Sequence, residues 1–103
     1  MTREMSQIDV AEIVTTSIRE ALLAPQDIIV PSARLFSDLE AESIDIVDIR
    51  FRIEQAIGSK IDQGAMTDYL GKNLTAVKFD NLFTVQFIID YVRLLLDQRE
   101  KNE

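Results

Sequence analysis

Apolar residues recur along most of the chain at spacings of three and four, which is the pattern of amphipathic α-helices rather than of strands. The first such segment runs from about Ile8 to Leu23. Ser6 and Asp9 near its start resemble a capping box, and Pro25 ends it. The residues that share one face of this segment, and are predicted to be buried, are Ala11, Val14, Ile18, Ala21 and Leu22.

The second clear segment predicts a helix from about Ser43 to Ile57, ended by Gly58. Its β-branched residues would also suit a strand, but the 3.6-residue period holds over the whole segment. A later helix is predicted from about Thr84 to Arg99. The predicted buried positions of these two helices are Ile46, Ile49, Ile53, Ala56, Ile57, Val85, Ile88, Ile89, Val92, Leu95 and Leu96.

The connections between these helices are longer than simple turns. Residues 25–42 contain apolar anchors and predict an ordered loop that packs across the helices. Residues 61–81 suit a further helix, weakened by Gly64 and Gly71. The pattern therefore predicts an all-α fold of three main helices, a shorter or extended third segment and a long first loop. We expect one domain over residues 1–103, with a core at about 6–98 and a frayed tail at 99–103.

Composition limits the function. The chain has 11 basic and 18 acidic residues, a net charge of −7, and neither His nor Cys. This charge disfavours nucleic acid and anionic membranes as partners and favours basic proteins. The chain lacks the commonest general base and nucleophile, so we expect no enzyme, and it offers no thiolate metal site. It also has no apolar run long enough to insert in a membrane and no signal-peptide core, so a cytoplasmic location is expected.

The stretch DLEAESIDIVDI, residues 38–49, places one serine among acids at the predicted start of the second helix. Taken alone, Ser43 suits a simple N-cap and the acids suit a solvated helix face. The alternative is that Ser43 is an attachment point for an anionic group, because the free N–H groups of the helix start stabilise a negative charge there. A hydrolase that uses Ser43 lacks any visible base.

The same stretch resembles the phosphopantetheine motif of acyl carrier proteins. Asp38 and Leu39 match the Asp-Leu-Gly lead-in of that family, Ser43 falls on the modified serine, and Ile44 matches the leucine that follows it. The segments IGSKI and TVQFIIDYV are similar to the family's end of helix two and its last helix, so the resemblance covers about residues 6–98.

The resemblance implies a monomeric four-helix bundle of acyl-carrier type. Such a protein holds acyl intermediates as thioesters on a covalent 4′-phosphopantetheine arm, which a phosphopantetheinyl transferase would attach to Ser43 from coenzyme A. It serves fatty acid, lipid or secondary-metabolite synthesis and is not itself an enzyme. Since the chain has no Cys, the arm must supply the thiol of the thioester.

The resemblance also implies two sets of site residues. One set would meet acyl-transfer, synthase or ligase enzymes through their basic docking patches, and the other would line an acyl pocket, with plain core packing as the alternative for the second set. The recognition residues are Glu42, Ile44, Asp45, Asp48 and Glu54, together with Arg50 and Arg52, which would alter this acidic surface and disfavour the wrong partners, or would be plain surface charges. The pocket residues are Val47, Phe51, Ile61, Met66 and Leu70.

The chain departs from the family pattern at several positions. Glu42 and Glu40 replace the usual Asp and Gly, and Arg50 and Arg52 stand where apolar residues are usual. The region between the second and last helices is also longer than in standard fatty-acid carriers. These departures predict a specialised carrier for a dedicated pathway. A peptidyl or aminoacyl carrier, and an unmodified helical adaptor that binds other proteins, remain as alternatives.

Overall fold

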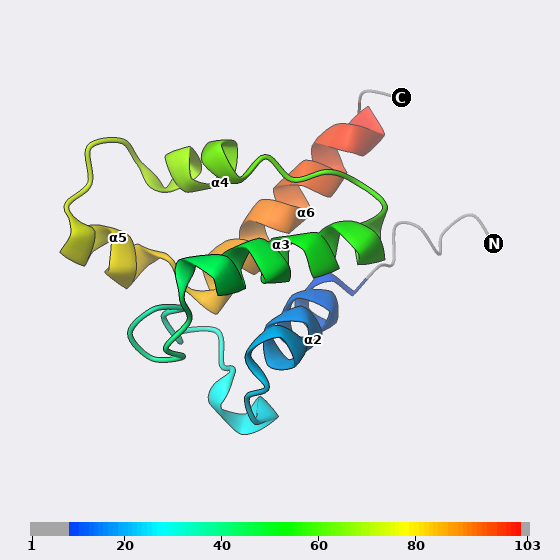
Figure 1. The fold of residues 1–103 in the computed structure, drawn as a ribbon. Coiled ribbons are helices and arrows are strands. Elements are labelled where there is room, and N and C mark those ends of the chain that lie inside the picture. The colour runs from blue at the N-terminus through cyan, green and yellow to red at the C-terminus, as the bar shows by residue number, and fades with distance from the viewer. Residues whose placement is uncertain (1–8, 102–103) are drawn as a thin grey trace.

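The computed structural model describes residues 9–101, and all regular structure in this range is helical. The described residues form five α-helices and a short 3₁₀ turn, η1. Figure 1 shows how the helices are arranged in space. Their bounds are α2 (Val10–Leu22), η1 (Gln26–Ile28), α3 (Ser43–Ile57), α4 (Gln63–Leu70), α5 (Ala76–Leu82) and α6 (Val85–Lys101). The predicted all-α fold is confirmed.

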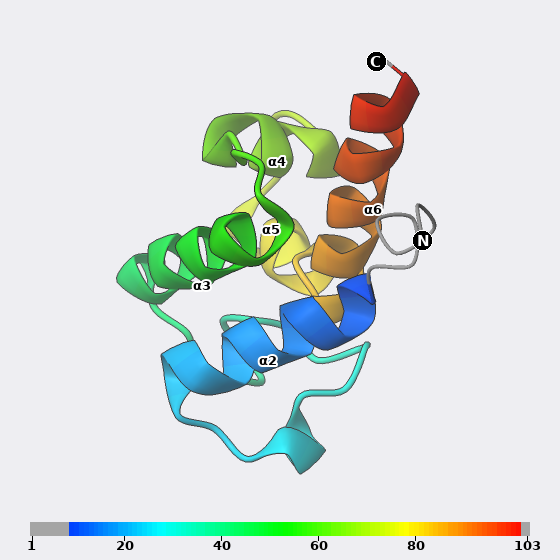
Figure 2. The same ribbon diagram turned by 90° about the vertical axis from the view of Figure 1, so that its right-hand side faces the viewer.

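The core lies between α2, α3 and α6. Figures 1 and 2 show α3 lying against α2 on one side, while α4 lies on its other side and α6 closes the bundle. The three long helices bury most of the positions that their apolar periods predict. Ala56 is exposed instead, and the predicted positions that are only partly buried are Ala11, Ala21, Leu22, Leu95 and Leu96. Their most deeply buried side chains are Val14, Ile18, Ile49, Ile53, Val85 and Val92.

Helix α2 begins two residues later than the sequence pattern predicts. Asp9 is its N-cap, and its carboxylate accepts a hydrogen bond from the Glu12 N–H at 3.1 Å. The predicted capping partner Ser6 lies outside the described residues. The helix ends at Leu22, before a left-handed Leu23 at φ 54°.

The long first loop is ordered and attached to the start of α6. The N–H of Leu35 donates to the carbonyl of Phe83 at 3.0 Å, and the N–H of Val85 donates to the carbonyl of Ala33 at 3.0 Å. Of the apolar anchors expected from the sequence, Leu35 and Leu39 are less than a tenth exposed, whereas Ile28 and Val30 are 43% and 44% exposed. Ile29, between those two, is buried in their place. The loop therefore has a fixed position against the start of α6, and this fixes the point at which α3 begins.

The region between α3 and α6 forms two short helices instead of one segment. Asp62 caps α4 and Thr75 caps α5, each by accepting a backbone N–H. Gly71 lies between them at φ 140°, a conformation that no helix continues through. Because the chain restarts at Thr75, Val77 does not share the face of α4 and is 70% exposed.

The predicted frayed tail is also wrong in part, since α6 continues to Lys101. The Arg99 guanidinium donates to the carbonyl of Ile57 at 3.2 Å, which ties this last turn to the end of α3. A basic residue in the last turn also suits the negative end of the helix dipole. None of the helices in the described range has the length and apolarity that crossing a membrane requires.

Candidate cofactor attachment site

Ser43 is the first residue of α3, and its side chain is exposed. Glu42 is the N-cap, so the interpretation of Ser43 as a simple cap does not hold. The first hydrogen bonds of α3 run from the N–H groups of Asp45 and Ile46 to the Glu42 carbonyl, at 2.9 and 3.2 Å. The N–H groups of Ser43 and Ile44 consequently have no acceptor within the helix. An anion on Ser43 would meet these donors and the positive end of the helix dipole.

The first turn presents an acidic and apolar surface around the serine. Ile44 is 73% exposed beside it, and Glu42 is exposed before it. Asp45 has a structural role as well, because its carboxylate accepts the Glu42 N–H at 2.8 Å and so stabilises the start of α3. The turn therefore combines a reachable hydroxyl with an aliphatic side chain and carboxylates.

Hydrogen bonds between Arg34 and Asp38 fix the loop just before this turn. The Asp38 carboxylate accepts hydrogen bonds from the Arg34 N–H at 2.8 Å and from its Nε at 3.0 Å. These contacts hold the pKa of Asp38 below its ordinary value, with the side-chain hydrogen bond from Arg34 as the largest cause. Arg34 also donates to Asn81 of α5 at 3.0 Å. Asp38, matched to the family motif by sequence, is thus a loop-positioning residue here.

Glu40 lies in the left-handed region at φ 59°. The turn around it is closed by a hydrogen bond from the Ala41 N–H to the Leu35 carbonyl at 2.9 Å. A glycine, which the family usually has here, adopts this conformation without a steric penalty. This chain makes the turn with a glutamate instead, whose side chain is strained in this conformation.

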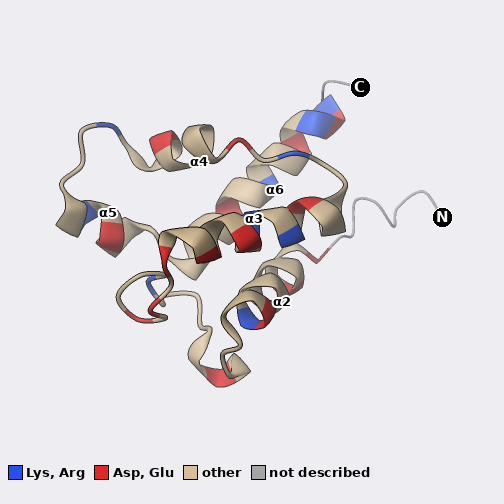
Figure 3. Ribbon diagram, viewed as in Figure 1, with Lys and Arg blue, Asp and Glu red and all other residues tan. Residues whose placement is uncertain are grey.

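Charge along α3 changes between its two halves. Figure 3 shows acidic residues from the start of the helix and basic residues only in its second half. Asp48 is paired with Arg52 at 3.0 Å, and Arg52 also meets Glu20 of α2 at 3.2 Å. The negative charge without a cation beside it therefore lies at Glu42, which is exposed, and at Asp45, which is partly exposed, since Asp48 is paired with Arg52.

Glu54 and Arg50 correct the expectation that both face partners. The Glu54 side chain is only 10% exposed, and its Oε2 accepts the Ile61 N–H at 2.7 Å and the Arg50 Nη1 at 2.9 Å. The backbone hydrogen bond from Ile61 is the largest cause of a Glu54 pKa below its ordinary value. Arg50 turns toward the interior to make this pair, so neither side chain projects from the helix as a docking charge.

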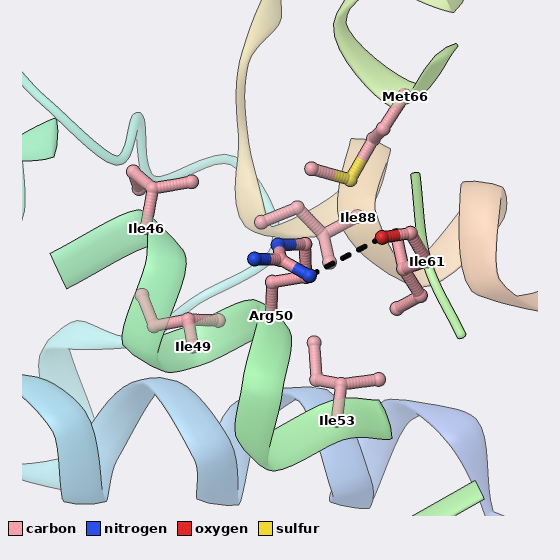
Figure 4. Close-up of a pocket in the computed structure, with 7 residues that line it drawn as sticks. All are labelled: Ile46, Ile49, Arg50, Ile53, Ile61, Met66 and Ile88. Atoms are coloured by element: carbon pink, nitrogen blue, oxygen red, sulfur yellow. Dashed lines mark hydrogen bonds between the residues drawn. The ribbon is translucent and has the colours of Figure 1, made fainter. Parts of the chain in front are cut away.

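A small cavity lies between α3, α4 and α6. Figure 4 shows the Arg50 guanidinium among apolar side chains that line it. Two of the predicted pocket residues, Ile61 and Met66, are in this lining. The lining residues that we did not predict as a pocket are Ile46, Ile49, Arg50, Ile53 and Ile88. The sequence already indicated that the lining residues of α3 lie together, because positions 46, 49, 50 and 53 share one helical face.

The other predicted pocket residues lie elsewhere. Val47 is 44% exposed and Phe51 54% exposed, because the second apolar stripe of α3 faces away from the cavity. Leu70 is half-buried against the core and is not part of the lining. Val47 and Phe51 instead continue the exposed apolar surface that begins at Ile44. Within residues 9–101, no cluster of side chains suits a metal ion.

Comparison with known proteins identifies the class. A family model described as phosphopantetheine attachment site matches residues 12–72, more than half of the chain, and the match includes all of α3. The chain belongs to this family, in agreement with its resemblance to acyl carrier proteins. No curated protein and no solved structure matched the chain.

Membership defines the role in general terms. Domains of this family carry 4′-phosphopantetheine as a covalent prosthetic group and interact with transferases and synthases. They are carriers and not catalysts. The first turn of α3 fits such a group, since it combines an exposed hydroxyl with two backbone N–H groups that lack acceptors in the helix.

Proposed function

We propose that Ser43 is the attachment residue and that the chain carries acyl groups as thioesters on its arm. The observation that supports this most strongly is the exposed serine at the first position of α3, inside the region that matches the family. The arm supplies the thiol, which this chain lacks. The residues of the chain hold the arm: Ser43 Oγ carries its phosphate, and the N–H groups of Ser43 and Ile44 stabilise the negative charge.

Partner recognition, in this proposal, uses the first turn and the exposed apolar stripe of α3. Glu42 and Asp45 attract basic groups of the partner, while Ile44, Val47 and Phe51 supply apolar contact area. Exposed charge pairs contribute little each, which suits a carrier that leaves one enzyme for the next. The partners are a phosphopantetheinyl transferase, and acyl-transfer, synthase or ligase enzymes with basic patches.

We also propose that the carrier is specialised, working as a monomer in the cytoplasm for a dedicated branch of fatty acid, lipid or secondary-metabolite synthesis. Arg50 and Arg52 in α3, together with the extra helix between α3 and α6, support this proposal. The net charge of −7 favours an acyl cargo over a peptidyl one.

The test is the intact mass after incubation with a broad-specificity phosphopantetheinyl transferase, coenzyme A and Mg²⁺. We expect one arm on the wild-type chain and none on Ser43→Ala. Ser59→Ala is the matched control, because Ser59 follows the other end of α3 and is partly exposed. It should gain one arm like the wild type.

An arm on Ser43→Ala would overturn the assignment of the residue. Failure of the wild-type chain to gain mass with several transferases would favour the unmodified adaptor. Glu42→Asp combined with Glu40→Gly then restores the family's usual residues. Modification of that double variant alone would show that the chain requires a transferase that reads Glu42 and Glu40.

A further inference from the structure

We propose that Arg50 selects the cargo, favouring acyl groups with a hydroxyl or carbonyl oxygen in the chain over plain alkyl chains of equal length. The inference rests on the proposed function and deepens it, since it concerns what the arm carries. It starts from the position of one cation in an otherwise apolar cavity.

The cavity between α3, α4 and α6 is small and only partly open. Its free volume is about 10 Å³, close to the space of a single water molecule. Six of its seven lining residues are isoleucine or methionine, and the seventh is Arg50. An acyl chain can therefore enter only if α3 and the segment that contains Ile61 and Met66 move apart. Met66 suits such movement, because its unbranched side chain adapts to cavities of different shape.

Polar contacts across the cavity mouth oppose this opening. The Arg50 Nη1 donates to the Ile61 carbonyl at 3.3 Å, drawn as a dashed line in Figure 4, and the Arg50 Nε donates to Gln63 Oε1 at 3.2 Å. Glu54 accepts the Ile61 N–H at 2.7 Å. We call Arg50, Glu54, Ile61 and Gln63 the α3–α4 clamp. Its members join α3 to the start of α4.

A plain alkyl chain meets a cost at this clamp. To pass between α3 and the Ile61 segment it must draw the guanidinium away from the Ile61 carbonyl or from Gln63. The guanidinium and its former acceptor are both partly buried, so each then lacks a hydrogen bond that water does not replace, and this raises the free energy. The methylene groups of an alkyl chain form no hydrogen bond that would offset the loss. An oxygen in the chain accepts a hydrogen bond from the guanidinium and replaces what is lost.

The guanidinium has donors left for such an oxygen. It carries five N–H groups in a planar fork. Its hydrogen bonds to the described residues use Nε and Nη1 and leave Nη2 without a partner among them. A chain oxygen beside Nη2 gains a bond without breaking the pair with Glu54.

The favoured oxygen is neutral. Glu54 lies 2.9 Å from Arg50 Nη1, and its lowered pKa keeps it ionised at neutral pH. The pair therefore has no net charge, and a carboxylate on the cargo would face the Glu54 carboxylate. A hydroxyl or carbonyl meets the donor without this repulsion.

The experiment compares chains of one length on loaded protein. From octanoyl-coenzyme A the transferase attaches octanoyl-4′-phosphopantetheine to Ser43 Oγ and releases adenosine 3′,5′-bisphosphate. Hydroxyoctanoyl-coenzyme A thioesters give the matching arms with the hydroxyl at different positions along the chain. Intact mass confirms loading in every sample. The readouts are the melting temperature relative to acetyl-loaded protein and the methyl NMR shifts of Ile61 and Met66.

For the wild type we expect at least one hydroxyoctanoyl group to raise the melting temperature by about 4 °C more than octanoyl does. The same group should shift the Ile61 and Met66 methyl signals. Arg50→Met should remove this preference and let octanoyl shift the methyl signals more. Arg93→Met, the same substitution at an exposed position of α6, should keep the wild-type preference.

Equal effects of octanoyl and all hydroxyoctanoyl groups on the loaded wild type would overturn this inference alone. So would a preference that survives in Arg50→Met. If Arg50→Met does not fold, Arg50→Lys serves, since it keeps the charge without the planar fork and should reduce the preference. Absence of any added mass on both the wild type and the variant that combines Glu42→Asp with Glu40→Gly would overturn the attachment proposal and this inference with it.

Discussion

The start and the end of α3 have similar acidic residues in different surroundings. Glu42, before the first turn, is exposed, whereas Glu54, near the end, is 10% exposed and paired with Arg50. The difference arises because Arg50 and Arg52 each lie one turn from an acid of the same helix, and no basic residue lies within one turn of Glu42. An acidic side chain of this helix is thus available to partner proteins only where no cation of the same chain is paired with it.

The largest expected effect is on stability, from removal of Glu54. Glu54→Ala leaves the Ile61 N–H and the Arg50 guanidinium without their shared acceptor, so we expect a loss of about 2 kcal/mol in the free energy of unfolding. Glu42→Gln should change it by less than about 0.5 kcal/mol. Urea denaturation of both variants measures the contrast. Equal losses in the free energy of unfolding would show that Glu54 contributes no more to stability than the exposed Glu42.

The same contact predicts how stability depends on pH. The ordinary pKa of the Glu54 carboxyl is 4.5, and the Ile61 N–H, followed by Arg50 and Lys60, lowers it in the folded protein. The unfolded chain therefore binds the proton first as pH falls. The contribution of Glu54 is complete above about pH 4.5 and is lost as pH falls through the folded pKa. Thermal melts from neutral pH to pH 3 should show a shallower decline for Glu54→Gln; parallel curves would contradict the assignment.

A smaller gain in stability is expected at Glu40. Replacing a non-glycine residue at φ 59° with glycine relieves the steric penalty, and the greater freedom of glycine in the unfolded chain offsets part of that gain. Glu40→Gly should therefore stabilise the protein by about 0.5 to 1 kcal/mol in chemical denaturation. Glu40→Ala, which removes the charge and keeps the strain, is the control. Stabilisation by both variants to the same degree would point to charge repulsion instead.

The smallest effect concerns arm transfer. Glu42→Gln removes an exposed charge beside Ser43 and should lower kcat/KM of the transferase about threefold at low salt, with a weaker effect at high salt. Asp48→Asn should change it less, because Arg52 already neutralises Asp48. Steady-state rates of arm addition measure both. A larger effect of Asp48→Asn would place the transferase contact further along α3.

Much of the fold follows from local pattern. The bounds of α3 were predicted correctly, and α2 and α6 were predicted to within two residues at each end, because long amphipathic helices repeat their signal over several turns. The region between α3 and α6 was not predicted as two helices. Short helices of seven or eight residues carry few periodic positions, and their caps at Asp62 and Thr75 decide where they begin.

The candidate site likewise has one part that the sequence predicts and one part that it does not. Its serine, the acids around it and the family to which they belong were readable from residues 38–49, because a motif that enzymes recognise is local in sequence. The cavity was not readable as such: Val47 and Phe51 were predicted to line it, and Ile88, from a distant helix, lines it instead.

The sequence by itself determined the helices, the serine motif and the negative charge, since each depends on residues within a few turns of one another. Only the tertiary structure decided that Arg50 and Glu54 face inward. Their partners are the Ile61 backbone and Gln63, which follow the end of α3 and return alongside it only when α4 folds back. A charged side chain turns toward the interior only where hydrogen-bond partners lie there, acceptors for Arg50 and a donor for Glu54, and these partners come together only in the folded chain.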